Sequence, residues 1–170
     1  GPVYIFDSTG QILIGTEAGP VGLRGVLRWA IPAEVAGKTI TLAKVLTTLD
    51  QKMGADTAQQ HVGPYHVNGL ADPELDDEAT QGERTDIAAT KYLTTSTYQT
   101  DSPRNKEVDI TSGAAAHIVA AAGATYALVI MDTDETTNGT KRINLVGEDE
   151  SPTPPDHIPQ LYLEYTDGGG

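Results

Sequence analysis

Short runs of alternating or β-branched residues recur along the whole chain and constrain its fold more than any other feature. The longest run spans 39–49, and others lie at 11–15, 26–30 and 125–131. Alternation is typical of strands with one buried face, and β-branched side chains pack well on a pleated surface. About ten short strands are therefore expected, the remainder being at 3–6, 61–67, 92–98, 107–110, 142–146 and 160–165.

The segments between these runs contain turn residues and few helical patterns, which favours an all-β protein. The 170 residues fit one domain of ordinary size. We expect a two-sheet antiparallel β-sandwich over 1–167, followed by a glycine-rich tail or linker at 168–170. One short helix is expected near 112–122, with Thr111 or Ser112 as its N-cap and Gly123 after its end.

Two further features give this fold its detail. Asn138 and Gly139 predict a tight hairpin turn between the strands at 125–131 and 142–146. The acidic segment 71–90 has no clear period and is expected to form a long surface loop. The expected inward-facing residues are Ile12, Ile14, Leu27, Trp29, Ile40, Leu42, Val45, Leu128, Ile130, Leu161 and Leu163.

The charge balance excludes several classes of partner. The chain has 24 acidic and 11 basic residues, a formal net charge of -13, so it repels nucleic acid and anionic lipid. No apolar run approaches the ~20 residues that a membrane-spanning helix needs, so we expect no membrane insertion. The absence of cysteine excludes disulfides and thiolate metal sites. Gly1 and Pro2 resemble a protease remnant, so we expect a piece of a longer protein.

Several sequence blocks, taken in order, resemble a known family. LIGT at 13–16 leads to RGVLRWAIPA at 24–33 and GKTITLAKV at 37–45. The second half continues with EVDIT at 107–111, ATYALVI at 124–130, INLVGEDE at 143–150 and IPQLYLEY at 158–165. These blocks are similar to the strands and turns of DNRLRE-type jelly-roll domains, in which an arginine-rich strand precedes an isoleucine-proline turn.

This resemblance covers about residues 11–166, nearly the whole expected domain. It implies a two-sheet jelly roll, and it implies carbohydrate binding, adhesion or cell-surface or virion structure. The asparagine-tyrosine-glycine turn near the family's start and its tryptophan-rich middle are absent here. The long acidic loop takes the place of that middle part.

Common catalytic patterns are missing from the sequence. No Gly-x-Ser-x-Gly motif occurs, and nothing singles out one of the four histidines as a catalytic base. His61 and His66 flank a Gly-Pro turn with a spacing that matches no zinc motif. The abundant acids are expected to be solvated surface groups. We therefore expect no enzymatic activity.

Two kinds of binding site are nevertheless compatible with the sequence. Tyr65, Tyr92 and Tyr98 flank the acidic loop and are the candidates for stacking on sugar rings. Trp29, the single tryptophan, is expected in the core. A structural calcium ion is the cofactor compatible with the sequence, held by Asp132, Asp134 and Glu135, or instead by acids of the long loop, namely Asp72, Asp76 and Asp77.

The leading functional hypothesis is a non-catalytic, glycan-directed recognition or adhesion module on an extracellular, cell-surface or virion protein. The alternative is a structural or decoration subunit of a phage capsid, tail or fibre, or of another extracellular assembly, acting through protein contacts. Formation of a homo-oligomer is left open. A glycan binder should display two or three exposed aromatic rings in a concavity, whereas an assembly subunit should display an apolar contact surface.

Overall fold

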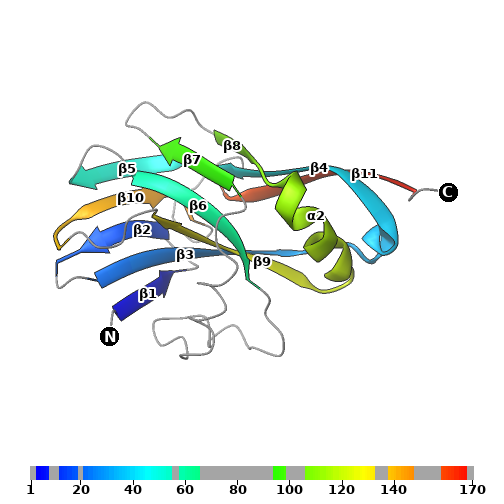
Figure 1. The fold of residues 1–170 in the computed structure, drawn as a ribbon, viewed down its shortest axis with the longest axis horizontal. Helices are drawn as coiled ribbons and strands as arrows, with labels where there is room; N and C mark the ends of the chain where they lie inside the picture. Colours follow the sequence, from blue (N-terminus) through cyan, green and yellow to red (C-terminus); the bar gives the residue numbers. More distant parts are fainter. Residues whose placement is uncertain are drawn as a thin grey trace.

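Figure 1 shows a computed structural model of the protein, which describes residues 3–7, 12–18, 21–54, 58–65, 94–98, 106–132, 138–147 and 158–167. Strands make up most of these ranges, so the expected all-β class is confirmed. Within them, no helix has the length and apolar character needed to cross a membrane. The elements are β1 (Val3–Asp7), β2 (Ile12–Glu17), β3 (Val21–Ala30), η1 (Ala33–Val35), β4 (Lys38–Thr47), β5 (Leu49–Gly54), β6 (Ala58–Tyr65), β7 (Thr94–Tyr98), β8 (Lys106–Asp109), α2 (Thr111–Ala120), β9 (Thr125–Asp132), β10 (Lys141–Leu145) and β11 (Gln160–Asp167).

These strands form two sheets. The larger has eight strands, in the order β5-β10-β2-β3-β9-β6-β7 with β1 also paired to β3, and the smaller has the order β11-β4-β8. All pairings are antiparallel except β1 with β3. The predicted two-sheet antiparallel sandwich is therefore confirmed. The jelly-roll order of its strands stays a prediction.

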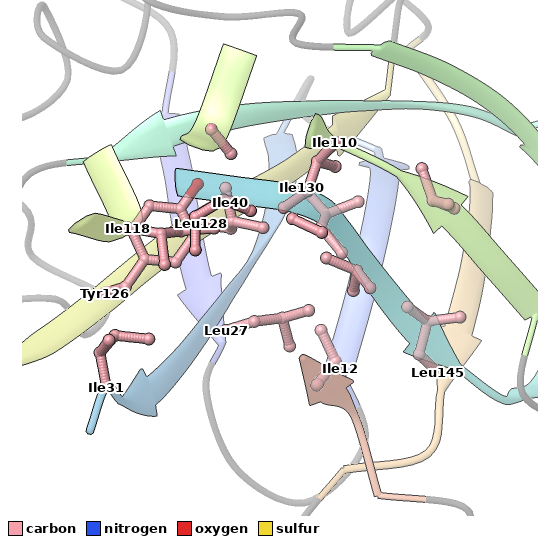
Figure 2. Close-up of a cluster of buried hydrophobic side chains, with 14 of the residues drawn as sticks. Ile12, Leu27, Ile31, Ile40, Ile110, Ile118, Tyr126, Leu128, Ile130 and Leu145 are labelled. Atoms are coloured by element: carbon pink, nitrogen blue, oxygen red, sulfur yellow. The ribbon is translucent and has the colours of Figure 1, made fainter. Parts of the chain in front are cut away.

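The core lies between the sheets and draws on both of them. Leu128 and Ile130 of β9 lie in one buried cluster with Ile40 of β4 and Ile118 of α2 (Figure 2). Most predicted core residues are buried there: Ile12, Ile14, Leu27, Ile40, Val45, Leu128 and Ile130. Trp29, Leu161 and Leu163 pack against the cluster but are only partly buried.

Leu42 does not face this core, which corrects the prediction. On β4, Leu42 lies opposite Glu164 while Ile40 lies opposite Tyr165, so Thr41 is an extra residue in a β-bulge. A bulge shifts the alternation of side chains by one residue. Ala43 is consequently buried and Leu42 is partly exposed on the other face.

The predicted strand 39–49 is two strands that belong to different sheets. β4 ends at Thr47 in the smaller sheet, and β5 begins at Leu49 in the larger one. Thr48, the residue between them, is buried, and its carbonyl accepts a hydrogen bond from the Val146 N–H at 2.9 Å. Threonine suits a strand on either side of the crossing, so the pattern of residue types does not reveal the change of sheet.

The predicted helix is confirmed as α2, but its predicted cap is wrong. Ile110, rather than Thr111 or Ser112, occupies the N-cap position, and its side chain forms no capping hydrogen bond. The Asp109 carboxylate, one residue earlier, accepts a hydrogen bond from the Thr111 N–H at 2.9 Å. The Thr111 hydroxyl instead accepts a hydrogen bond from the Ala43 N–H of β4, also at 2.9 Å. Ala114 and Ile118 are buried, so α2 covers one end of the core. Gly123 follows the helix with a φ of 77°, as its predicted role requires.

The predicted hairpin at Asn138 and Gly139 is also wrong. β9 and β10 are separated in the larger sheet by β3 and β2, so the connection between them is not a hairpin. The Gly139 carbonyl accepts a hydrogen bond from the Thr16 hydroxyl of β2 at 3.0 Å. An Asn-Gly pair signals a local change of chain direction, but it does not specify which strands become neighbours.

Candidate functional site

The solvent-facing side of the three-stranded sheet is the best defined surface in the described part of the chain. Residues directly opposite each other in paired strands share a face. Opposite the buried row of Ile40, Ala43 and Val45, this outer face carries Leu42, Lys44, Leu46, Glu107, Asp109, Gln160, Tyr162 and Glu164. The outer face is therefore a mixed surface of apolar and charged groups laid across three strands.

Lys44 is the cation of this outer face and lies among three carboxylates. Its Nζ atom is 3.0 Å from Oε2 of Glu107 on the neighbouring strand β8. This hydrogen bond and the charge of Glu107 raise the pKa of Lys44, and the charges of Asp109 and Glu164 raise it further. Three carboxylates against one ammonium leave the outer face acidic.

Tyr162 is the exposed large apolar side chain of the described residues, with 49% of its surface accessible. It lies opposite Lys44 on the outer face. Gln160 and Glu164, two residues away along β11, point to the same side. An accessible ring with hydrogen-bonding groups beside it is suited to contact with a protein or a sugar.

β11 also forms an open edge of the smaller sheet. Within the described part of the chain, β4 is the strand with which β11 pairs (Figure 1). Its inward-facing side chains, Leu161, Leu163 and Tyr165, are only partly buried, and we call them the edge row. Their counterparts on the central strand β4 are fully buried, so the edge row is an apolar strip that the fold leaves incompletely covered.

Both ends of β11 are held in place. At its start, the Trp29 indole N–H donates to the carbonyl of Pro159 at 3.2 Å. At its end, Lys38 forms an ion pair with Asp167. The Tyr165 hydroxyl donates to a Glu34 carboxylate oxygen at 2.7 Å, and this hydrogen bond raises the pKa of Tyr165. The edge is thus a fixed strand that can be matched by a partner.

The tyrosines predicted for sugar stacking are not all within the described residues. Tyr92 lies outside them, whereas Tyr65 ends β6 opposite Ala127 and Tyr98 ends β7 opposite Ala58. Ala58 and Tyr65 are the two ends of β6, about 23 Å apart at ~3.3 Å per residue. The backbone therefore places Tyr65 and Tyr98 near opposite ends of one strand pair.

Of the predicted calcium ligands, Asp132 is described and Asp134 and Glu135 lie outside the described residues. The Asp132 side chain is buried at the end of β9, and its Oδ1 atom is 3.2 Å from Nζ of Lys141. Asp72, Asp76 and Asp77 also lie outside the described ranges. Among the residues that the structure describes, no group of three or more acids and histidines is placed to hold a metal ion. Calcium binding stays a prediction.

The outer face was not predicted as a site, although part of its signal is present in the sequence. In the run Leu161-Tyr162-Leu163, the two leucines were expected to face the core, which by alternation places Tyr162 outside. The position of Lys44 beside Glu107 depends on the pairing of β4 with β8, which local periodicity does not reveal. No family model and no curated protein matches the chain.

Proposed function

We propose that the protein is a non-catalytic structural or decoration module that joins an extracellular or virion assembly through protein contacts made by its three-stranded sheet. The observation that carries this proposal is the open β11 edge, whose partly buried edge row adjoins the exposed Tyr162. The sequence resembles DNRLRE-type jelly-roll domains, and this resemblance implies cell-surface or virion structure among other functions, which agrees with the proposed role.

Edge strands offer unpaired backbone groups to other chains, and proteins that remain monomeric usually protect them. The protection takes the form of lysine, proline or inward-pointing charge. The eight residues of β11 contain no lysine, arginine or proline. The edge row carries no formal charge, and the two acids of the strand are Glu164 on the outer face and Asp167 at its end, paired with Lys38. An edge strand of about 23 Å whose edge row is uncharged supports a role in which this strand is covered by another chain.

The charges of the outer face also support a non-catalytic role. A general acid in a glycosidase needs a carboxyl group whose pKa is raised. Hydrogen bonds from the side chain and backbone of Thr111 lower the pKa of Asp109, with a further contribution from the charge of Lys44. A carboxyl group whose pKa is lowered in this way is unsuited to act as such an acid.

A glycan-directed module is the second candidate, and Tyr162 is the observation that favours it. Its exposed ring lies beside Gln160 and Glu164, whose polar groups can bind sugar hydroxyls. A binding platform of this kind normally combines several groups in a concave site. The outer face supplies one such ring among the described residues, so we rank assembly first.

The two functions are separated by measuring association and glycan binding on the same protein. Assembly predicts oligomers or attachment to a larger particle in native mass spectrometry and electron microscopy, without retention of sugars on a glycan array. Saturable glycan binding that is lost in Tyr162→Ala, by a protein that stays monomeric and attaches to no particle, would overturn the assembly proposal. Thr39→Ala, at an exposed position on β4, is the matched control.

A further inference from the structure

The hydrogen bond of Thr41 fixes which backbone groups of β11 reach its open edge. The Thr41 hydroxyl donates to the Glu164 carbonyl at 3.1 Å, so this carbonyl points toward β4. Successive residues of a strand direct their N–H and C=O groups to opposite sides. The backbone groups of Leu161, Leu163 and Tyr165 therefore point toward the open edge.

This edge matches itself in one register. Antiparallel pairing about a two-fold axis at Leu163 places Leu163 opposite its own counterpart and Leu161 opposite Tyr165 of the second copy. Each residue of the edge row then meets a residue of the edge row in the other copy, while Asp167, at the end of β11, lies opposite Pro159. The three residues of each strand can exchange on the order of six hydrogen bonds across the axis.

The side chains fit the same register. The edge row of one copy adjoins the edge row of the other on the inner face, where apolar surface is only partly covered. On the outer face, Tyr162 lies opposite Glu164 on both sides of the axis, so no like charges are directly opposed. Cross-strand pairs of this kind stabilise a sheet, whereas directly opposed like charges destabilise it.

Two neighbouring registers also place the inward-facing side chains of both copies on the same side of the combined sheet, but both are less favourable. An axis at Glu164 places two carboxylates directly opposite each other, which is unfavourable. An axis at Tyr162 places Tyr165 opposite Pro159, which has no N–H to donate and whose carbonyl already accepts a hydrogen bond from Trp29. Of these three registers, the one centred on Leu163 pairs all three residues of the edge row without placing like charges opposite each other.

We infer that a second copy of this chain covers the β11 edge, forming a six-stranded sheet in the order β8-β4-β11-β11-β4-β8 about a two-fold axis at Leu163. The inference rests on the proposed assembly function and names the partner of that same surface. Because each copy carries a net charge of -13, the dimer should tighten as salt screens the repulsion between copies.

The decisive experiment introduces opposite charges at one exposed position, Tyr162. Tyr162→Glu places two like-charged pairs with Glu164 across the axis, whereas Tyr162→Lys makes the same two pairs attractive. Sedimentation equilibrium of the whole chain should show a dimer whose dissociation constant rises about tenfold with glutamate and does not rise with lysine. Within one copy, a glutamate at position 162 lies opposite Lys44 and is attracted to it, whereas a lysine there is repelled. The free energy of unfolding of the monomer should therefore be higher for Tyr162→Glu than for Tyr162→Lys, the reverse of their order in dimer affinity.

A second measurement tests the register by disulfide formation. The chain has no cysteine, so a single introduced cysteine can cross-link only to its counterpart in another copy. Leu163→Cys lies on the proposed axis, within the separation that a disulfide allows. Glu164→Cys is the adjacent control, because in this register position 164 of one copy lies opposite position 162 of the other, two residues away from the second introduced cysteine. Oxidised glutathione should produce dimers of the first variant and not of the second.

Three results would overturn the inference: a wild-type chain that stays monomeric at all concentrations, equal effects of the two Tyr162 variants, or equal cross-linking of the two cysteine variants. A monomer that still attaches to a larger particle would remove the second copy and leave the assembly function standing. A monomer that binds glycan and attaches to nothing would remove both.

Discussion

The two sheets each contain an ion pair of similar length in a different environment. In the larger sheet, Lys141 and Asp132 are 3.2 Å apart, with 14% and 0% of their side chains exposed. In the smaller sheet, Lys44 and Glu107 are 3.0 Å apart, with 29% and 56% exposed. Removing one partner of a buried pair leaves a charge without compensation, whereas water replaces the partner of an exposed one. The stability of the larger sheet thus depends on its buried ion pair, while the smaller sheet exposes its pair to solvent.

The largest effect is expected from breaking the buried pair. Lys141→Met removes the ammonium beside the buried Asp132 carboxylate and should lower the free energy of unfolding by about 3–5 kcal/mol. Urea denaturation at pH 7 measures this change. Adding Asp132→Asn to the variant removes the buried negative charge and should restore part of the stability. A loss below about 1 kcal/mol for the single variant would show that the pair is not buried in solution.

A slightly smaller effect is expected where β2 approaches β10 closely. Gly15 has a φ of 136°, and a Cβ atom there would lie 2.0 Å from the carbonyl oxygen of Lys141. Gly15→Ala should therefore cost about 3 kcal/mol, because it combines backbone strain with overpacking. Gly37, before β4 of the smaller sheet, has a φ of 72° and no atom within 4 Å of such a Cβ. Gly37→Ala should cost about 1 kcal/mol, and equal losses in thermal unfolding would contradict the comparison.

The larger sheet also contains a buried hydroxyl whose removal should be favourable. Tyr126 is 2% exposed, and its hydroxyl has no hydrogen-bond partner in the described structure. Tyr126→Phe should therefore raise the free energy of unfolding by about 1 kcal/mol in urea denaturation at pH 7. A loss of stability would instead indicate a hydrogen bond to this hydroxyl.

The same residue gives the larger sheet a dependence on alkaline pH. Burial raises the pKa of Tyr126 above its ordinary value of 10.0. Below this ordinary pKa, the tyrosine is neutral in both the folded and the unfolded chain, so its ionisation costs no stability. As pH rises from there toward the pKa of the folded state, the unfolded chain ionises first and the free energy of unfolding falls. Unfolding measured from pH 9 to 11 should be less steeply pH-dependent in Tyr126→Phe than in the wild type.

The smallest effect is expected from the exposed pair. Lys44→Met should leave the midpoint of urea unfolding at pH 7 unchanged within error, because water solvates Glu107 when the ammonium is removed. Because the pKa of Lys44 is raised, the small stabilisation of the fold by its positive charge is fully present below the ordinary pKa of 10.5. It is lost as pH rises above that value. A marked loss at pH 7 would show that this pair supports the fold as the buried pair does.

Local patterns in the sequence predicted elements more successfully than their arrangement. Alternation identified the buried faces at Ile12, Ile14 and Leu128, because a strand with one covered face must alternate. It failed at Leu42, where an extra residue on β4 is defined only by the partner strand. It also failed at Thr48, since both sheets accept the same residue types.

The candidate site shows the same division. The outward position of Tyr162 was not predicted, although it follows from the alternation with Leu161 and Leu163. The contact between Lys44 and Glu107 joins residues 63 positions apart and depends on the pairing of two strands. The openness of β11 is a property of the whole sheet order, which no local pattern encodes.

The pairing of β11 with β4 has a consequence for folding during synthesis. Thr41 and Glu164, joined by a hydrogen bond, are 123 positions apart in the chain. A ribosome adding ~5–20 residues per second leaves β4 waiting several seconds or more for this neighbour. During that interval its apolar residues lack their final cover, and closing so long a loop is entropically slow. The nascent chain should therefore be most prone to aggregation just before β11 emerges.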